Sequence, residues 1–560
     1  MRKSTIILTL AAILSSNALS GQDTVFNRVV TVERDFQPDV QTAYKMQLTP
    51  QVFQEDQEKA KDSIMYSSYS IPLIVDYNLH PLKAAKTDFT PQHTLKGNIE
   101  GGIGHRNSHM AFDYRITEVP KMSLDLYANH NAYWGRDAIS ESNLGMKLVR
   151  NFKKIDLFFG LDGGNEYFTY YGRYFDGTNK LTIPVGTIVN ENQSIWDIQA
   201  NVGFKTNNRK SAFQYAFHTG YKAYIITNNM VENQLRTNFD MSWKAKKKHA
   251  AGVKFYMQNS MYSNPTQDST LHNKHALRLE PYYEYKHKAI RLYAGVNIGL
   301  NIGTGTLISV VDNVCFVPTP NIEFEWKMMD NIFHVYANAK GSMGVGSVEE
   351  YLGYNRYLNI LAGKTFNSPR NYTPADVQIG FKIRPVKTML LDIYGGYAYT
   401  IGANQMLAIL DTNNISVIDY TLDLNNLQCW KVGASLHYHY RDMINLNVNG
   451  NYYAYSTPNA TTPIYDRPSW ELYGRVDVKI DSKWSCYSEN YFAGKRLANT
   501  TQGDRHLKPS IELNLGAQYT INNWLLVYLQ LNNFLNRKND IVYGYQVQGC
   551  HFLGGVKYKF

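Results

Sequence analysis

Long apolar runs are missing from this chain, although 44% of its 560 residues are hydrophobic. A helix that crosses a membrane needs about 20 consecutive, predominantly apolar residues. No stretch of the sequence meets that requirement, so a helical membrane protein is excluded. The interior also lacks a break in composition that would divide so long a chain into separate domains. One large architecture has to account for most of the residues.

Cysteine is scarce, and its spacing is uninformative. The four cysteines are Cys315, Cys429, Cys486 and Cys550, and they lack the closely spaced pairs of zinc sites. An oxidising compartment would permit disulfides among them without requiring any. Small apolar packing residues are the simpler interpretation.

Sequence motifs for catalysis are missing as well. The GxSxG, HExxH and Walker patterns do not occur. A Ser–His pair that forms only in three dimensions stays open as an alternative. We predict a protein that is not an enzyme, with no catalytic residues, no bound metal and no cofactor. The net charge of +10 is too diffuse to indicate nucleic acid as a partner.

The first 20 residues have the pattern of a secretory signal. Arg2 and Lys3 precede an apolar core at Ile6–Leu14, and Ala18–Ser20 supplies small residues at the cleavage positions. The apolar core is too short to span a bilayer, which argues against the alternative of a membrane anchor. We predict a signal peptide at 1–20.

Residues 21–94 differ in composition from everything that follows. They carry five prolines, a charged middle and two short apolar pieces, Val29–Val32 and Ile71–Val75. This composition favours an extended segment with little core of its own. We predict that it lies in the periplasm or in the lumen of a larger structure.

From residue 95 to 560 the sequence alternates between apolar and polar residues. In Lys431–Tyr440 and Ile444–Tyr455 most even positions are apolar, while the odd positions carry histidines and a row of asparagines. Period-two alternation predicts strands with one face of each kind. In a transmembrane barrel the apolar face meets lipid and the polar face lines the lumen. The predicted lumen-facing residues of this hairpin are His437, His439, Asn445, Asn447 and Asn449.

The connections between these segments alternate between short and long. Short turns such as Lys286–Lys288 and Arg441–Met443 are followed by long links such as Gly341–Tyr372 and Thr400–Leu427. Short turns at one end and long loops at the other are typical of bacterial outer-membrane barrels. We predict an all-β fold, a transmembrane antiparallel β-barrel of about 22 strands over residues 95–560. A soluble propeller or large sandwich is the alternative, but neither explains the asymmetry of the connections.

Two further features suit a barrel. The chain has 43 tyrosines but only 8 tryptophans, and tyrosine suits both a membrane interface and a polar lumen. Five of the short turns are rich in lysine or arginine, above all Lys244–Lys248. Such turns either form a basic rim that meets an acidic partner or are simply solvated.

The last predicted strand ends on an aromatic residue, Phe560. Its outward set includes Phe552, Val556, Tyr558 and Phe560, and we predict that this strand closes the barrel by pairing with the first. A terminal strand ending in Phe resembles the signal that the outer-membrane barrel assembly machinery reads.

The segments Leu529–Arg537, Gly544–Tyr545 and Gly554–Phe560 resemble the end of TonB-dependent receptors. The resemblance implies an outer-membrane barrel that moves a solute or a larger substrate across the outer membrane. The family's plug is a folded domain, and residues 21–94 are too short and too rich in proline to form a complete one. The chain therefore resembles receptor-like barrels that lack a complete plug.

The resemblance also implies partners. These are outer-membrane lipid, the barrel assembly machinery, and either TonB or a periplasmic or lipoprotein partner. In the family, TonB binds a short extended segment near the mature N-terminus by strand addition. The candidate residues here are Val29, Val30, Thr31 and Val32. A non-conducting scaffold of an envelope complex, with a partner in place of the plug, stays open as the alternative to a transporter.

Overall fold

The computed structural model describes most of the chain from residue 96 onward. The described residues are 96–117, 121–135, 138–169, 192–208, 211–227, 230–245, 248–263, 272–303, 309–311, 314–329, 332–358, 371–409, 419–458 and 462–560. The predicted signal peptide, the segment 21–94 and the candidate contact Val29–Val32 lie outside them.

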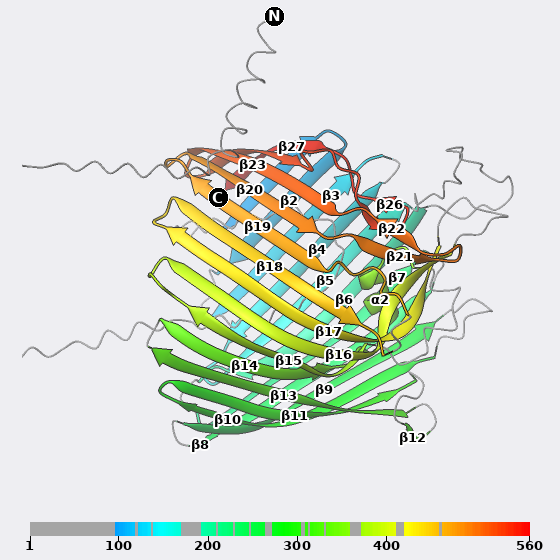
Figure 1. The fold of residues 1–560 in the computed structure, drawn as a ribbon. Coiled ribbons are helices and arrows are strands. Elements are labelled where there is room, and N and C mark those ends of the chain that lie inside the picture. Colours follow the sequence, from blue (N-terminus) through cyan, green and yellow to red (C-terminus); the bar gives the residue numbers. More distant parts are fainter. Residues whose placement is uncertain are drawn as a thin grey trace, which may run out of the picture. The chain divides into compact units, whose positions relative to one another are not determined.

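Twenty-two strands form one closed antiparallel barrel (Figure 1). The wall strands are β1 (Gly97–Gly104), β2 (Asn107–Ile116), β3 (Met122–Tyr133), β4 (Ile139–Asn151), β5 (Ile155–Thr169), β6 (Asn192–Thr206), β7 (Phe213–Ile226), β8 (Val231–Ala245), β9 (His249–Ser263), β10 (Lys274–His287), β11 (Ile290–Ile302), β13 (Val314–Met329), β14 (Phe333–Ser342), β15 (Tyr372–Ile383), β16 (Met389–Ile409), β17 (Asp419–Tyr440), β18 (Ile444–Ser456), β19 (Trp470–Lys479), β20 (Trp484–Ala493), β23 (Ser510–Asn522), β24 (Leu525–Asn532) and β27 (His551–Lys559). Each strand pairs with the next, and β27 pairs with β1, where Val556 lies opposite Gly101. The predicted fold class and strand number are confirmed.

Short elements lie in the connections. They are β12 (Ser309–Val311), α2 (Val348–Tyr354), β21 (Arg496–Thr500), β22 (Arg505–Leu507), β25 (Asp540–Val542) and β26 (Tyr545–Gln546). Among the described residues, no helix is long and apolar enough to cross a membrane; that finding concerns helices alone and is silent about spanning strands.

The predicted short turns that the structure describes in full, such as Lys286–Lys288 and Arg441–Met443, lie at one end of the barrel, which we call the turn end. The opposite end, the loop end, carries the long connections. In the β17–β18 hairpin Tyr440 pairs with Ile444 across a three-residue turn, as the alternation predicts. One prediction was wrong. The stretch Thr400–Leu427 is not an irregular link, because β16 runs on to Ile409 and β17 begins at Asp419.

The cause of this error is a shift in register. The pairing of β16 with β17 slips between Thr400 and Ala403, where Gly402 adopts a positive φ of 63°. A bulge of this kind interrupts the period-two pattern without ending the strand. Beyond it Ala403 and Met406 are buried, so the extension belongs to the interior of the loop end.

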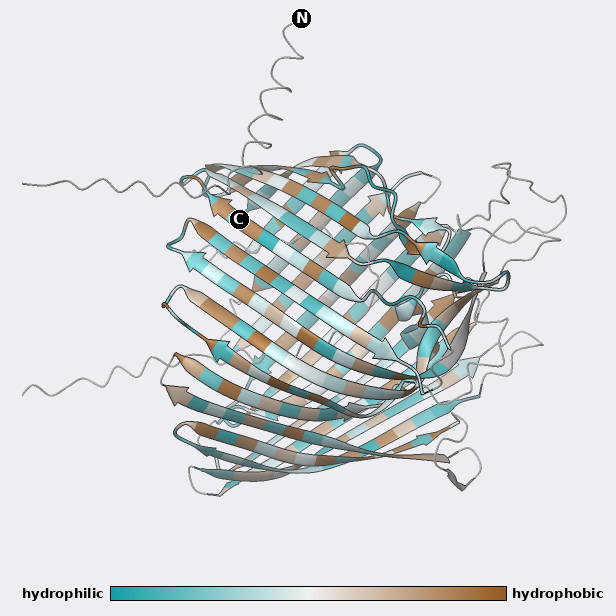
Figure 2. Ribbon diagram, viewed as in Figure 1, coloured by the Kyte–Doolittle hydropathy of each residue, from teal (hydrophilic) through white to brown (hydrophobic). Residues whose placement is uncertain are grey.

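The outer surface of the barrel is apolar and has tryptophan near both ends. On β17, Trp430 and Val432 are 61% and 60% exposed, whereas Ser435 on the opposite face is 8% exposed. Figure 2 shows this alternation of hydrophobic and hydrophilic residues along the strands. All eight tryptophans are exposed, four near the turn end (Trp243, Trp326, Trp484, Trp524) and four toward the loop end (Trp134, Trp196, Trp430, Trp470). An apolar band between two aromatic belts is the surface that a bilayer requires.

On the inner face, tyrosine rings cover glycines of neighbouring strands. A Cβ atom on Gly380 would lie 2.4 Å from the Tyr336 ring, whose hydroxyl donates to Asp392 Oδ1 at 2.9 Å. A ring over a glycine fills the space of the missing side chain and braces the strands. The same arrangement recurs at Tyr127 over Gly145, Tyr282 over Gly252, Tyr394 over Gly433, Tyr487 over Gly516 and Tyr528 over Gly555.

Candidate functional site at the loop end

Helix α2 lies at the loop end of the barrel, where it packs against residues of the wall. It belongs to the connection between β14 and β15 and lies beside the ends of β6, β7 and β16 (Figure 1). Ser347 caps it, since its Oγ accepts the Glu350 N–H at 3.2 Å. This Ser-x-x-Glu spacing is a helix-start signal.

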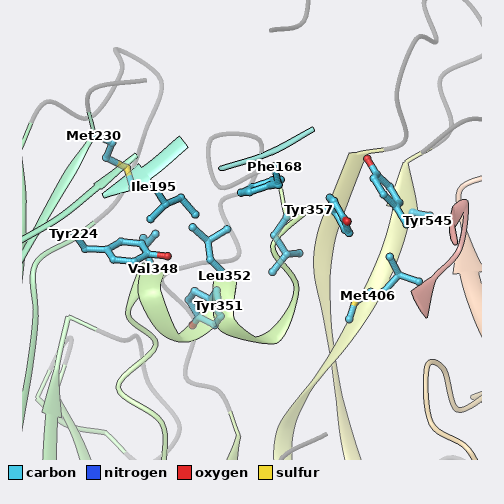
Figure 3. Packing of buried hydrophobic residues seen from close by; sticks show 13 residues of the cluster. Phe168, Ile195, Tyr224, Met230, Val348, Tyr351, Leu352, Tyr357, Met406 and Tyr545 are labelled. Carbon is cyan, nitrogen blue, oxygen red and sulfur yellow. The ribbon is translucent and has the colours of Figure 1, made fainter. Parts of the chain in front are cut away.

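Buried residues around α2 form a single hydrophobic cluster, the mouth cluster, which Figure 3 shows from close by. Its members come from α2 and the residues after it, from β5, β6 and β7, from Met230 just before β8, from β16 and from the β25–β26 hairpin. Seven wall strands separate β7 from β16, so a cluster that joins them has to cross the opening. The members are Phe168, Ile195, Tyr224, Met230, Val348, Tyr351, Leu352, Tyr357, Leu358, Met406, Ala408, Val542 and Tyr545.

Lysine and arginine side chains of the wall bind one side of the β14–β15 connection. The Glu349 carboxylate bridges Lys222 of β7 at 2.7 Å and Arg236 of β8 at 2.5 Å. Burial raises the pKa of Glu349, but the two cations more than offset it, and the net shift is downward. On β10, Lys274 donates to the carbonyl oxygen of Gly346. The Lys222 and Glu349 side chains are 15% and 24% exposed, so salt screens their ion pair less than one on an open surface.

A second set of contacts holds the end of the helix. Arg356 lies 2.7 Å from Glu166 and 3.7 Å from Glu141, which belong to β5 and β4. The next residue, Tyr357, stacks on Tyr545 with ring centroids 3.8 Å apart. The loop is therefore fixed to the β4–β5 wall and to the β25–β26 hairpin at once.

The third contact is with β16 and the β18–β19 connection. The Tyr354 hydroxyl donates to the Asn404 carbonyl at 3.2 Å, and Asp466 accepts the Met406 N–H at 3.0 Å. Burial raises the pKa of Asp466 to about 6, despite the opposing effects of that hydrogen bond and of Arg496 and Arg467.

Two cavities lie along the described wall, and α2 lines one of them. One of about 260 Å³ lies at the loop end, and its lining includes Lys222, Glu349 and Arg356. The other, of about 530 Å³, lies against β5 to β11, and its lining includes Lys254 and Arg278. Each lining combines charged side chains with apolar ones.

The residues singled out in the β17–β18 hairpin lie elsewhere on the wall and form a polar stripe. His437 Nδ1 is 2.6 Å from Asn447 Oδ1, and His439 lies opposite Asn445. Asn451 donates to Asn449 at 2.8 Å and accepts from the Tyr394 hydroxyl. In the part of the chain that the structure describes, no three His, Cys, Asp or Glu side chains group as a metal site requires.

The charged contacts of the loop end were not predicted from the sequence. Gly341–Tyr372 was predicted only as a long link, and Lys222, Arg236 and Glu349 were not singled out. Residues 347–350 contain the capping signal that would have located the helix. Nothing local in the sequence pairs Glu349 with Lys222, 127 positions away.

Solved structures of outer-membrane receptors share this fold. The siderophore receptor PirA from Acinetobacter baumannii aligns with a TM-score of 0.64 at 11% identity, over 83% of this chain and 80% of that one. The ferric-catecholate import receptor Fiu from E. coli K12 aligns at 0.61 and 11%, over 84% and 82%. The pyoverdine outer membrane receptor FpvA from Pseudomonas aeruginosa PAO1 aligns at 0.61 and 11%, over 84% and 79%. No family model matches the chain, and no curated protein does either.

At this level of identity the likeness concerns the fold. It confirms the barrel fold that the resemblance to TonB-dependent receptors implied. In this chain the barrel is closed by the pairing of β27 with β1. The apolar belt and the shared fold make this chain a β-barrel of the outer membrane.

Proposed function

We propose that this chain is a gated receptor barrel that moves a solute across the outer membrane through its lumen. The observation that carries the proposal is the closure of the loop end by α2. A barrel of about 22 strands has a lumen wide enough to leak unless something fills it. A segment that non-covalent contacts hold across the loop end suits a lumen that opens when a solute arrives.

The polar inner wall fits a wet path for a solute. His437, His439, Asn445, Asn447 and Asn449 are the proposed lumen-facing residues of one hairpin, in line with their hydrogen bonds to one another and to neighbours. The turn end then faces the periplasm and the loop end faces outside. The similar receptors PirA and Fiu act on a siderophore and a ferric catecholate, which supports import as the direction and an iron complex as one solute class.

We also propose that TonB supplies the energy for transport. Val29–Val32 is the candidate segment for strand addition to TonB. Lipid and the barrel assembly machinery are the other proposed partners, because every outer-membrane barrel of this kind needs both.

Conductance in planar bilayers tests the proposal. Four proteins are compared: the full chain, a deletion of residues 22–86, a replacement of residues 343–370 by a short linker, and the double variant. We expect a silent full chain and large conductance steps from the double variant. A double variant that is folded, as shown by heat-modifiable migration on gels, yet stays silent would overturn the proposal.

A scaffold in an envelope complex is the second candidate. The basic turn end favours it, because Lys153, Lys288, Arg384 and Lys483 all lie in short turns where an acidic partner would dock. Purification from native membranes tests this function. A stoichiometric partner that is lost on deletion of residues 22–86, with conductance unchanged, would favour the scaffold over the transporter.

A further inference from the structure

The larger cavity, of about 530 Å³, is built from two neighbouring rows of inward-facing side chains on β5 to β11. On β7, Phe213 and Tyr221 are exposed on the outer face, so the alternation of the strand turns Ala216 and His218 toward the lumen. The pairing of each strand with the next places the residues of one row side by side. Each row therefore crosses the strands as a continuous track along the inner wall.

The row nearer the loop end carries aromatic rings. Phe158 and His218 stack with their ring centroids 5.5 Å apart, across Gly203, where a Cβ atom would clash with the Phe158 ring. Tyr256 continues the row one strand beyond Asn238. The face of an aromatic ring is electronegative and attracts polarised C–H groups. This row therefore offers a platform for a ring whose face is rich in C–H groups, as the face of a sugar is.

The row nearer the turn end alternates in charge. Its polar members, in the order of the strands, are Lys205, Asp240, Lys254, Glu280 and Asn297. Lys254 stands opposite both Asp240 and Glu280, and its Nζ lies 3.4 Å from the Glu280 carboxylate. Because neighbouring strands are about 4.8 Å apart, an ionic ligand on this row would meet a like charge beside each opposite one. A hydroxyl group avoids that conflict, since it donates to a carboxylate and accepts from an ammonium group.

The polar row ends at an amide with an unsatisfied oxygen. In the part of the chain that the structure describes, Asn297 Oδ1 is buried without a hydrogen-bond partner. Thr319 lies opposite Asn297 and is 2% exposed, and its Oγ1 has no such partner either. Buried polar atoms are nearly always hydrogen-bonded, so an unpaired couple beside a cavity calls for an explanation. Rotation of the Asn297 amide brings its oxygen to the cavity, where a hydroxyl group of a ligand would donate to it.

We propose that this cavity binds a neutral, polyhydroxylated ligand, a sugar chain. Its ring faces lie on the aromatic row of Phe158, His218 and Tyr256, and its hydroxyl groups bond to the polar row from Asp240 to Asn297. The volume is within the range of small-molecule sites. This inference rests on the proposed function, because it names a class of solute for the same lumen and gives the inner wall the part of holding that solute on its way through.

Isothermal titration calorimetry with three neutral oligosaccharides, maltohexaose, mannohexaose and xylohexaose, tests the site. The detergent-solubilised full chain is titrated both unsubstituted and as Tyr357→Ala, which loosens the loop end and so admits a ligand from that side. We expect saturable binding of at least one of the three sugars. The absence of saturable binding of all three sugars to both proteins would overturn the proposal.

Two substitutions assign the binding to the aromatic row. Phe158→Leu keeps an apolar side chain over Gly203 but has no ring, and His218→Ala removes the ring stacked on it. Each should weaken binding of the best sugar by about three- to tenfold, the loss expected for one stacking contact. His334→Ala is the matched control, because His334 on β14 lies outside the lining of the cavity. Unchanged affinity in both row variants, or an equal loss in His334→Ala, would contradict the assignment.

A comparison of ligands needs no substitution and so does not depend on the folding of a variant. Oligogalacturonate, which is anionic, and an oligomer of glucosamine, which is cationic, should each bind at least about tenfold more weakly than the best neutral sugar, because each meets like charges on the polar row. A charged oligomer that binds as tightly would refute a neutral ligand. A barrel that conducts when opened but binds no sugar refutes this inference alone, whereas a silent barrel that binds one refutes transport alone.

Discussion

The β17–β18 hairpin depends on pairing between neighbouring segments of the chain, whereas the loop-end closure depends on contacts between residues far apart in the sequence. The hairpin pairs 13 residues with 13 in unbroken register, from Gln428 opposite Ser456 to Tyr440 opposite Ile444, and its partners are neighbours along the chain. The closure joins Glu349 to Lys222 and Tyr357 to Tyr545, far apart in sequence. The wall is a repetitive structure that tolerates one register only, whereas the closure is a set of individual contacts that can be exchanged.

The largest expected effect is on the wall. Val432→Arg places a charge on the lipid face at a position 60% exposed, where arginine near the bilayer midplane costs about 2–4 kcal/mol. We expect little folded protein in outer-membrane fractions, judged by heat-modifiable migration. Lys431→Arg is the control, because residue 431 carries a cation that pairs with Asp376 at 2.6 Å on the other face. Equal yields of the two variants would argue against opposite faces.

The next effect separates the closure from the wall. Tyr357→Ala removes a ring that is 6% exposed and stacked on Tyr545, and such a loss costs about 3 kcal/mol of local stability. We expect frequent openings in planar bilayers when the substitution is made in the protein that lacks residues 22–86, while the barrel keeps its heat-modifiable migration. The control is Tyr452→Ala, a ring 58% exposed on the outer face. If Tyr357→Ala unfolds the whole barrel, the closure is not independent of the wall.

The sequence predicted the wall because the wall repeats. Strand number, turn positions and the Tyr440–Ile444 register all follow from alternation within about ten residues. The closure could not be found in this way, because Lys222, Arg236 and Arg356 look like ordinary polar positions until the fold brings them together. The extension of β16 past Gly402 was missed for a related reason, since one bulge reverses the faces that the alternation assigns.

A smaller effect concerns pH. Burial raises the pKa of Asp466 from 3.8 to about 6. Between these two pH values the carboxyl group is protonated in the folded protein and ionised in the unfolded chain. Local stability should therefore fall as pH rises from about 4 to 6, by up to about 3 kcal/mol, and stay low above that. Hydrogen exchange at 462–469, corrected for its intrinsic pH dependence, should be slower at pH 5 than at pH 7.

Asp466→Asn is the matched variant for this prediction. Its amide oxygen can still accept the Met406 N–H, and asparagine tolerates the positive φ of 61° at this position. The pH dependence of exchange should disappear in Asp466→Asn. A dependence of the same size in both proteins would assign it to another group.

The smallest expected effect concerns backbone strain at the turn end. Lys288, in the two-residue turn between β10 and β11, has a φ of 48°, which costs a non-glycine residue about 1 kcal/mol. Lys288→Gly should slightly raise the temperature at which heating unfolds the barrel and changes its migration on gels. Lys286→Gly, which places glycine inside β10, should lower it. A lower temperature for Lys288→Gly would show that the lysine side chain matters more than the strain.

Hydrogen exchange at residues 343–358 tests the central claim, closure of the loop end by α2, most directly. The strands β17 and β18 of the same molecule serve as the internal reference. The account predicts that amides of 343–358 exchange slowly in the full-length wild type and become fast in Tyr357→Ala, while the two strands stay unchanged in both proteins. Exchange at 343–358 as fast as in a free peptide in the wild type would contradict a closed loop end.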